Sequence, residues 1–83
     1  MSKQDNYSEE ELIHIACTNS YRAIILQEDW QEIIMEEENF FVHNPAKRVV
    51  DLQIVDTLLF YFNELEDFEK CIRIRNFLQE KMN

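Results

Sequence analysis

The sequence predicts an all-α fold, a small helical bundle of three or four helices that ends in an antiparallel helical hairpin. Two observations lead to this prediction. Glycine is absent and proline occurs once among 83 residues, whereas average glycine usage of about 7% would give roughly six. Tight β-hairpin turns depend on glycine or asparagine, so few of them can form. Apolar residues also recur at the helical spacing of three and four along most of the chain.

The chain length limits how much apolar surface the fold can bury. A chain of 83 residues forms at most one domain and buries about 60 to 65% of the surface that its unfolded state exposes. Stability is therefore marginal unless the helices pack well, or unless self-association or a partner buries more surface. Residues 1–83 are expected to form a single helical domain with an acidic segment at 9–38, a connection at 39–44 and a helical hairpin at 45–82.

The acidic segment begins with a helix start signal. Ser8 and Glu11 have the spacing of a capping box, which predicts a helix that begins directly after Ser8. The apolar residues that follow keep one helical phase through the segment. This phase predicts one continuous helix over 9–38, and a helix pair with a break near Asn19 or Ser20 is the alternative.

Three bulky apolar residues, Phe40, Phe41 and Val42, lie in the connection. Connecting segments normally run over the protein surface, so these side chains must be covered by the domain or by a partner. We expect the connection to fold back onto the acidic segment. The alternative is that Phe40 and Phe41 form an aromatic anchor for a partner.

The hairpin is predicted from caps and periodicity. Asn44 followed by Pro45 is typical of an N-cap and a first helical residue, so a helix is expected from there to about Asn63. A turn up to Glu66 and a third helix follow. In the absence of glycine, Asn39 and Asn63 are expected to take the left-handed conformation at helix ends. The apolar residues of the third helix are Phe68, Cys71, Ile72, Ile74, Leu78 and Met82.

The third helix also resembles a known motif. In spacing, Phe68-Glu69, Cys71, Ile74-Arg75-Asn76 and Leu78 resemble the UVR motif of bacterial nucleotide-excision-repair subunits and of some protease-regulator proteins. The resemblance implies a helical hairpin, with 52–63 as its first helix, that docks on the equivalent hairpin of a partner. The partner-binding residues that it implies are Phe68, Glu69, Cys71, Ile74, Arg75 and Leu78.

Three residues depart from the UVR pattern. Cys71 stands where alanine is usual, Ile72 where another small residue is usual, and Asn76 where an acid is usual. The alternative is a generic helical hairpin, in which Phe68, Cys71, Ile74 and Leu78 fill the internal core of this chain.

Negative charge is concentrated in the acidic segment. Residues 9–38 carry nine acids and one base, Arg22, which gives −8, whereas residues 45–83 carry seven acids and six bases, which gives −1. Such a segment repels nucleic acid and anionic lipid, so direct binding to either is not expected. It attracts a basic protein surface, or it is simply a solvated face. The residues of the candidate acidic face are Glu28, Asp29, Glu32, Glu36 and Glu37.

The sequence contains no motif for catalysis or for a cofactor. There is no glycine-rich phosphate loop, no C-x-x-C and no H-E-x-x-H. His14 and Cys17, one helical turn apart, are too few ligands for zinc. We therefore expect no catalytic, cofactor-binding or metal-binding residues and no enzymatic activity. Cys17 and Cys71 lie in apolar helical patterns and are expected to be buried thiols. With neither a secretory signal nor a long apolar run, a cytoplasmic location is expected.

Two functions are compatible with these features. The first is a protein-protein interaction module, an adaptor or regulator, whose hairpin docks on another protein or on a second copy of the chain. The second is an inhibitor of the kind that phages produce, which imitates nucleic acid by placing its acidic helix in a basic groove. Apolar docking should change little with salt, whereas acidic mimicry should weaken steeply.

Overall fold

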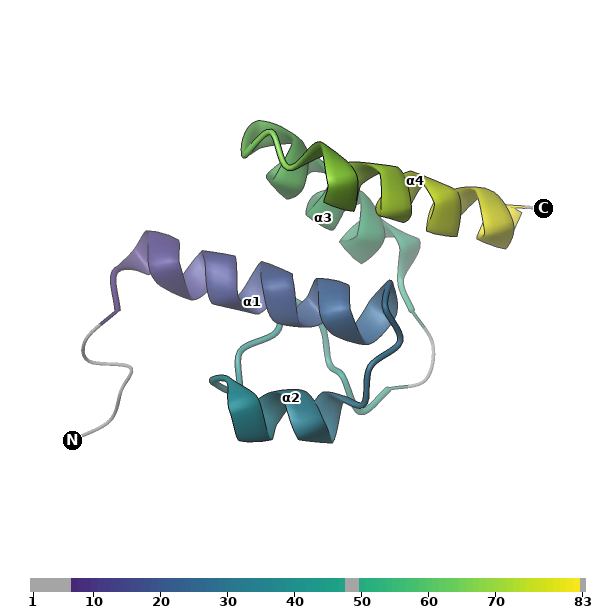
Figure 1. Cartoon of the computed structure of the whole chain (residues 1–83). Helices are drawn as coiled ribbons and strands as arrows, with labels where there is room; N and C mark the ends of the chain where they lie inside the picture. The colour runs from purple at the N-terminus through teal and green to yellow at the C-terminus, as the bar shows by residue number, and fades with distance from the viewer. Residues whose placement is uncertain (1–6, 48–49, 83) are drawn as a thin grey trace.

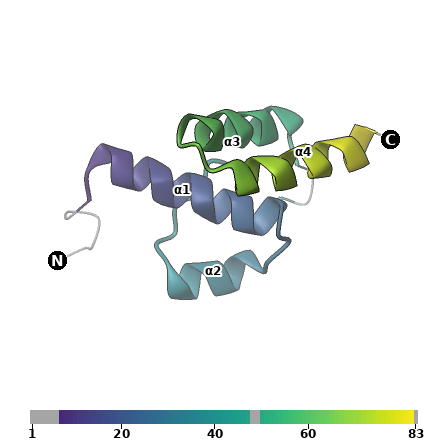
Figure 2. The same cartoon turned by 45° about the horizontal axis from the view of Figure 1, so that its top comes forward.

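The computed structural model of the chain describes residues 7–47 and 50–82. Within these residues it contains four helices and no strand: α1 (Glu9–Ile24), α2 (Trp30–Glu36), α3 (Leu52–Glu64) and α4 (Phe68–Met82). The predicted all-α class and the C-terminal helical hairpin are confirmed. Figure 1 shows that α1 lies between α2 and the hairpin formed by α3 and α4, and Figure 2 shows the same order from a second direction.

α1 begins as the sequence predicts. The Ser8 Oγ accepts a hydrogen bond from the Glu11 N–H at 3.1 Å, and the Glu11 Oε1 accepts one from the Ser8 N–H at 3.2 Å. Both bonds of the capping box are therefore present. They satisfy two backbone donors that a helix start would otherwise leave without partners.

The prediction of one continuous helix over 9–38 is wrong, because α1 ends at Ile24 and α2 begins at Trp30. The break also comes later than the alternative at Asn19 or Ser20. Gln27 takes a left-handed backbone conformation with φ 57°, and the Asp29 side chain caps α2 by accepting from the Gln31 N–H at 3.0 Å. An aspartate at the N-cap satisfies a backbone donor of the first helical turn and so favours a helix start at Trp30.

The second helix of the predicted bundle starts later than expected. Asn44 does cap a turn, since its side chain accepts from the Ala46 N–H at 3.0 Å, but the described residues on both sides of 48–49 are not helical. α3 starts only after Asp51, whose carboxylate accepts from the Gln53 N–H at 2.9 Å. The expected helix start at Pro45 is therefore wrong. Asn44 and Asp51 each accept a hydrogen bond from the N–H two residues later, and the helix begins after Asp51.

The left-handed residue in the turn between α3 and α4 is neither glycine nor asparagine. Glu66 has φ 59° and its N–H donates to the Asn63 carbonyl at 3.0 Å, while the Asp67 N–H donates to the Phe62 carbonyl at 2.9 Å. These two bonds form a Schellman motif. The expectation that Asn39 and Asn63 take the left-handed conformation is wrong: among the described residues Gln27, after α1, and Glu66, after α3, take it.

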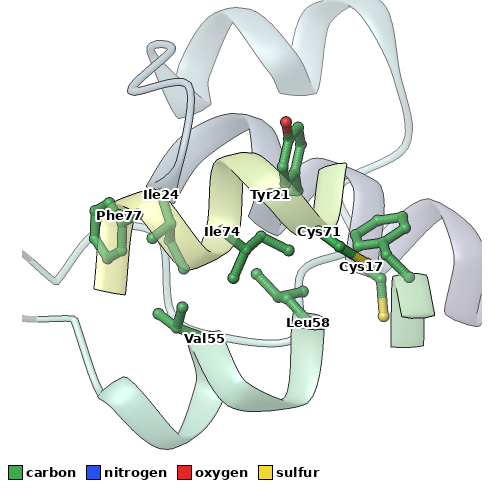
Figure 3. Packing of buried hydrophobic residues seen from close by; sticks show 9 residues of the cluster. Cys17, Tyr21, Ile24, Val55, Leu58, Cys71, Ile74 and Phe77 are labelled. Carbon is green, nitrogen blue, oxygen red and sulfur yellow. The ribbon is translucent and has the colours of Figure 1, made fainter. Parts of the chain in front are cut away.

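The apolar core joins α1 to both helices of the hairpin (Figure 3). The Tyr21 ring meets the Phe62 ring edge-on, with 5.6 Å between the centroids. Cys17 and Cys71 are both buried free thiols, as predicted, and burial raises the pKa of the Cys17 thiol. The buried members of the core are Cys17, Tyr21, Ile24, Val55, Leu58, Phe62, Cys71, Ile74 and Phe77. None of the helices in the described part of the chain has the length and apolar character needed to cross a membrane.

Two isoleucines of α4 provide a matched test of this core. Ile74 is completely buried, whereas Ile72, two residues earlier, is 55% exposed. Ile74→Ala should lower the free energy of unfolding by about 2 to 5 kcal/mol because it leaves a cavity in the core. Ile72→Ala should change it by less than about 0.5 kcal/mol when both are measured at a protein concentration at which the chain is monomeric. Urea unfolding followed by circular dichroism measures both; equal losses in the two variants would contradict the observed orientation of α4.

Candidate interaction surfaces

The side of α1 that faces away from the hairpin is polar and buried. Asn19 is 1% exposed, and its side-chain amide donates to the carbonyl oxygens of Glu38, at 2.9 Å, and Phe40, at 3.0 Å. An amide buried in mid-helix requires such partners, because an unsatisfied donor costs about 1 to 3 kcal/mol. Asn19 therefore fixes the chain that follows α2 against α1, which explains why Asn19 lies inside a helix.

Ser20 fixes the next residues of the connection in the same way. Its Oγ accepts from the Val42 N–H at 2.9 Å and lies 2.8 Å from the His43 Nδ1. Ser20 is 0% exposed, so its hydroxyl has no access to a substrate. Its contacts indicate a structural hydrogen-bond partner and not a nucleophile activated by a histidine.

The connection folds back onto the domain, as expected. Phe40 and Phe41 are both half-buried, and the Phe41 ring lies edge-on to the His43 ring with 5.7 Å between centroids. Val42 packs against the apolar core. Only part of each phenyl ring is left on the surface, so an aromatic anchor at Phe40 and Phe41 stays a prediction that these contacts do not favour.

The candidate acidic face is divided by Arg22. The Arg22 guanidinium donates to both carboxylate oxygens of Glu28, at 3.0 and 2.7 Å, and also to Glu36 at 2.9 Å. These hydrogen bonds lower the pKa of the Glu28 carboxyl below its usual value. Because the break between α1 and α2 removes Glu28 and Asp29 from a helix, the five predicted acids do not form one helical row. Of these five, only Glu32 and Glu37 are exposed without an ion pair or a side-chain hydrogen bond in the described part of the chain.

The residues implied by the UVR resemblance divide into buried and exposed groups. Cys71 and Ile74 are 0% exposed and Leu78 is half-buried against the core. Cys71 and Ile74 therefore pack inside this chain and are not surface residues, because α1 and α3 cover that side of α4. The exposed members are Phe68, Glu69 and Arg75.

Large apolar side chains are nevertheless exposed on both helices of the hairpin. Phe60 is 67% exposed, Phe68 58% and Ile72 55%. Phe68 and Ile72 are one turn apart on α4, and Phe60 points away from the face of α3 that carries Val55 and Phe62. We call Phe60, Phe68 and Ile72 the outer face.

Sequence reasoning missed two members of the outer face, Phe60 and Ile72. The signal for Phe60 was its position out of phase with the apolar ridge of α3. The signal for Ile72 was weaker, because periodicity alone does not say whether Ile72 or Ile74 meets another helix.

Charged side chains around the outer face are mostly paired along α4. Lys70 bonds to Asp67 at 2.8 Å and Arg73 to Glu69 at 3.5 Å. Arg75, in contrast, is exposed and has no ion pair within the residues described. Asp56 on α3 is likewise exposed and has no ion pair within them. Asp56 and Arg75 are therefore one acid and one base, among the exposed charges of the hairpin, that are available to a partner.

His14 and Cys17, the pair considered as metal ligands, lie in different surroundings. His14 is exposed and its Nδ1 lies 2.9 Å from the Tyr61 hydroxyl, whereas Cys17 is buried in the core. Across residues 7–47 and 50–82, no three histidine, cysteine, aspartate or glutamate side chains gather in a way that could hold a metal ion.

Comparison with known proteins does not identify a family for this chain. No protein-family model, no curated protein and no solved structure matches it.

The ion pair between Arg22 and Glu28 predicts that the stability of the fold depends on pH. The lowered pKa of Glu28 means that its carboxylate stabilises the folded state above the usual value of 4.5, and that this contribution is lost as the pH falls through the folded-state pKa. Glu28→Gln should therefore be less stable than the parent at neutral pH, by less than about 1 kcal/mol because the pair is partly exposed. The difference should disappear in acid.

Urea unfolding of both proteins at neutral pH and in acid measures this difference. Glu32→Gln is the control, because Glu32 is exposed and forms no ion pair in the described part of the chain. A Glu28→Gln difference that stays constant with pH would contradict the role of Arg22.

Proposed function

We propose that this protein is a protein-protein interaction module whose hairpin docks through the outer face on the equivalent hairpin of a second copy. The observation that carries the proposal is the outer face itself: three large apolar side chains on two packed helices, with no other element of the described chain covering them. Exposed apolar side chains clustered on one side of a small protein mark interaction sites more often than scattered ones do.

The charge distribution favours a second copy at this face. The hairpin region 45–83 carries −1, with seven acids and six bases, whereas 9–38 carries −8. Hairpin-to-hairpin docking keeps the acidic segments on opposite sides of the pair, so their repulsion is reduced by distance and by salt. In a two-fold symmetric contact, Asp56 of each copy can meet Arg75 of the other, because each surface is used twice.

The resemblance to the UVR motif supports the same mode of docking. That motif forms a helical hairpin that docks on a partner's equivalent hairpin. The matching residue that is exposed and apolar here is Phe68. A contact of this kind would bury on the order of 1,200 Å² in total, at the lower end of specific interfaces.

The oligomeric state tests the proposal. Sedimentation equilibrium of the full chain should show dimers with a dissociation constant in the micromolar range. Ile72→Asp and Phe68→Asp should each weaken dimerisation by at least about tenfold, because a carboxylate would be desolvated in an apolar contact. Dimerisation of the parent should change little between about 50 and 300 mM salt.

The control is Met35→Asp on α2. Met35 is 87% exposed and lies outside the hairpin, so the same change of side chain should leave the dimer intact. A parent chain that remains monomeric at high concentration would exclude self-association. Equal weakening by Met35→Asp would show that the outer face is not the contact.

A second function, imitation of nucleic acid, rests on the net charge of −8 over residues 9–38. Glu9, Glu10 and Glu11 at the start of α1 are exposed, as are Glu32 and Glu37. Arg22 neutralises part of the remainder through Glu28 and Glu36. The acidic surface is thus spread over two helices and is not the single helical row that the sequence predicted.

Charge reversal tests the second function. If α1 and α2 imitate nucleic acid, Glu32→Lys combined with Glu37→Lys should abolish binding to a nucleic-acid-binding protein of the host, and DNA should compete for that binding. The matched control is Glu64→Lys combined with Glu80→Lys, both exposed residues of the hairpin. Binding that resists about 300 mM salt would contradict mimicry, because contacts of this type are strongly screened.

A further inference from the structure

A cavity of about 520 Å³ lies where α1 ends. Its walls come from the end of α1, the residues between α1 and α2, the start of α2, the 43–47 segment, Val50 with the start of α3, and the C-terminal half of α4. Trp30 and Phe77 supply aromatic walls, and Leu52 adds an aliphatic one. Its volume lies in the range of about 300 to 1,000 Å³ that is typical of sites for small molecules.

The charges around this cavity are opposite in sign to those of the whole chain. The chain carries −9, yet the charged residues of the described part of the chain that line the cavity are two lysines, Lys47 and Lys81, and one acid, Glu28. Glu28 is already bonded to Arg22 through both carboxylate oxygens. The cavity therefore has an excess of positive charge, which an anionic ligand would neutralise.

Lys81 is held at the cavity by an aromatic contact. Its ammonium nitrogen lies 5.3 Å from the centroid of the Phe77 ring, and Phe77 is buried in the core. A cation over an aromatic face is attracted by the ring quadrupole. The contact positions a cationic group beside an apolar wall, which is the combination that an amphipathic anion requires.

His43 adds an imidazole ring to the lining. The Ser20 Oγ accepts from the Val42 N–H at 2.9 Å and lies 2.8 Å from the His43 Nδ1, and the direction of this second hydrogen bond depends on the tautomer of the ring. Burial lowers the pKa of His43, which favours the neutral ring at pH 7. Nε2 has no hydrogen-bond partner among the described residues and is available to a ligand.

We propose that this cavity binds a small organic acid with an apolar body. The carboxylate is held by Lys47 and Lys81, and the apolar body lies against Trp30 and Phe77. A medium-chain fatty acid has this chemistry and a size that the cavity accommodates. The site is separate from the outer face of the hairpin, so it is a second binding function beyond docking.

The chain has a single tryptophan, Trp30, and it lines the cavity. Its fluorescence therefore reports directly on occupancy. Octanoate, which does not absorb in the tryptophan range, should give a saturable change with a dissociation constant of about 1 mM or below. Octanamide, which has the same chain without the charge, should bind at least about fivefold more weakly because it forms no ion pair.

Variants identify the residues that hold the carboxylate. Lys47→Gln combined with Lys81→Gln should weaken octanoate binding by about fivefold or more and leave octanamide binding unchanged. Arg73→Gln combined with Arg75→Gln removes the same amount of charge outside the cavity and should leave the affinity within about twofold. Lys81→Arg, which keeps the charge, should retain binding, and circular dichroism checks that each variant is folded.

Three results would overturn the proposal. One is the absence of a saturable Trp30 signal with octanoate. Another is equal affinity for octanoate and octanamide, which would indicate nonspecific apolar binding. The last is equal weakening by the Arg73→Gln, Arg75→Gln pair, because then net charge, and not the cavity lysines, would attract the acid.

Discussion

The structure depends on one stretch of α1, residues 17–24, which buries two faces of different chemistry. Cys17, Tyr21 and Ile24 pack into the apolar core with the hairpin (Figure 3). Asn19 and Ser20 turn the other way and bond to the segment that follows α2. Within the described residues, α1 is the helix in contact with both α2 and α3. The two halves of the molecule are the hairpin on one side and α2 with the segment after it on the other. They are held together because α1 contacts both.

Both proposed binding surfaces follow from this arrangement. α1 covers one side of the hairpin, and no other described helix covers Phe60, Phe68 and Ile72, which remain exposed. Because α1 ends at Ile24, well before the end of the acidic segment, the chain turns away and leaves the space lined by Trp30 and Phe77. Apolar surface on the hairpin and a cationic cavity beside it are consequences of where one helix lies and where it stops.

The sequence was sufficient for features that local chemistry determines. The helical class, the capping box at Ser8 and the end of α3 near Asn63 depend on spacing and on nearby side chains. The break after α1 could not be predicted in this way, because apolar phase continues on both sides of it and the left-handed residue there is Gln27, not glycine. The partners of Asn19 lie about twenty residues further along the chain, so no local pattern reveals that this polar residue belongs inside a helix.

The two faces of α1 also give the two halves of the molecule different responses to temperature. Apolar contacts between α1 and the hairpin weaken on cooling, since the hydrophobic effect is largely entropic near room temperature. On its other side, α1 holds the segment after α2 with the hydrogen bonds of Asn19 and Ser20, which do not share this dependence, in addition to the apolar packing of Val42. Cold should therefore weaken the hairpin side more, because the other side keeps its hydrogen bonds. On cooling, the amide protons of α3 and α4 would then lose protection against exchange with solvent first. The Val42 N–H, which donates to the Ser20 Oγ, would lose its protection later.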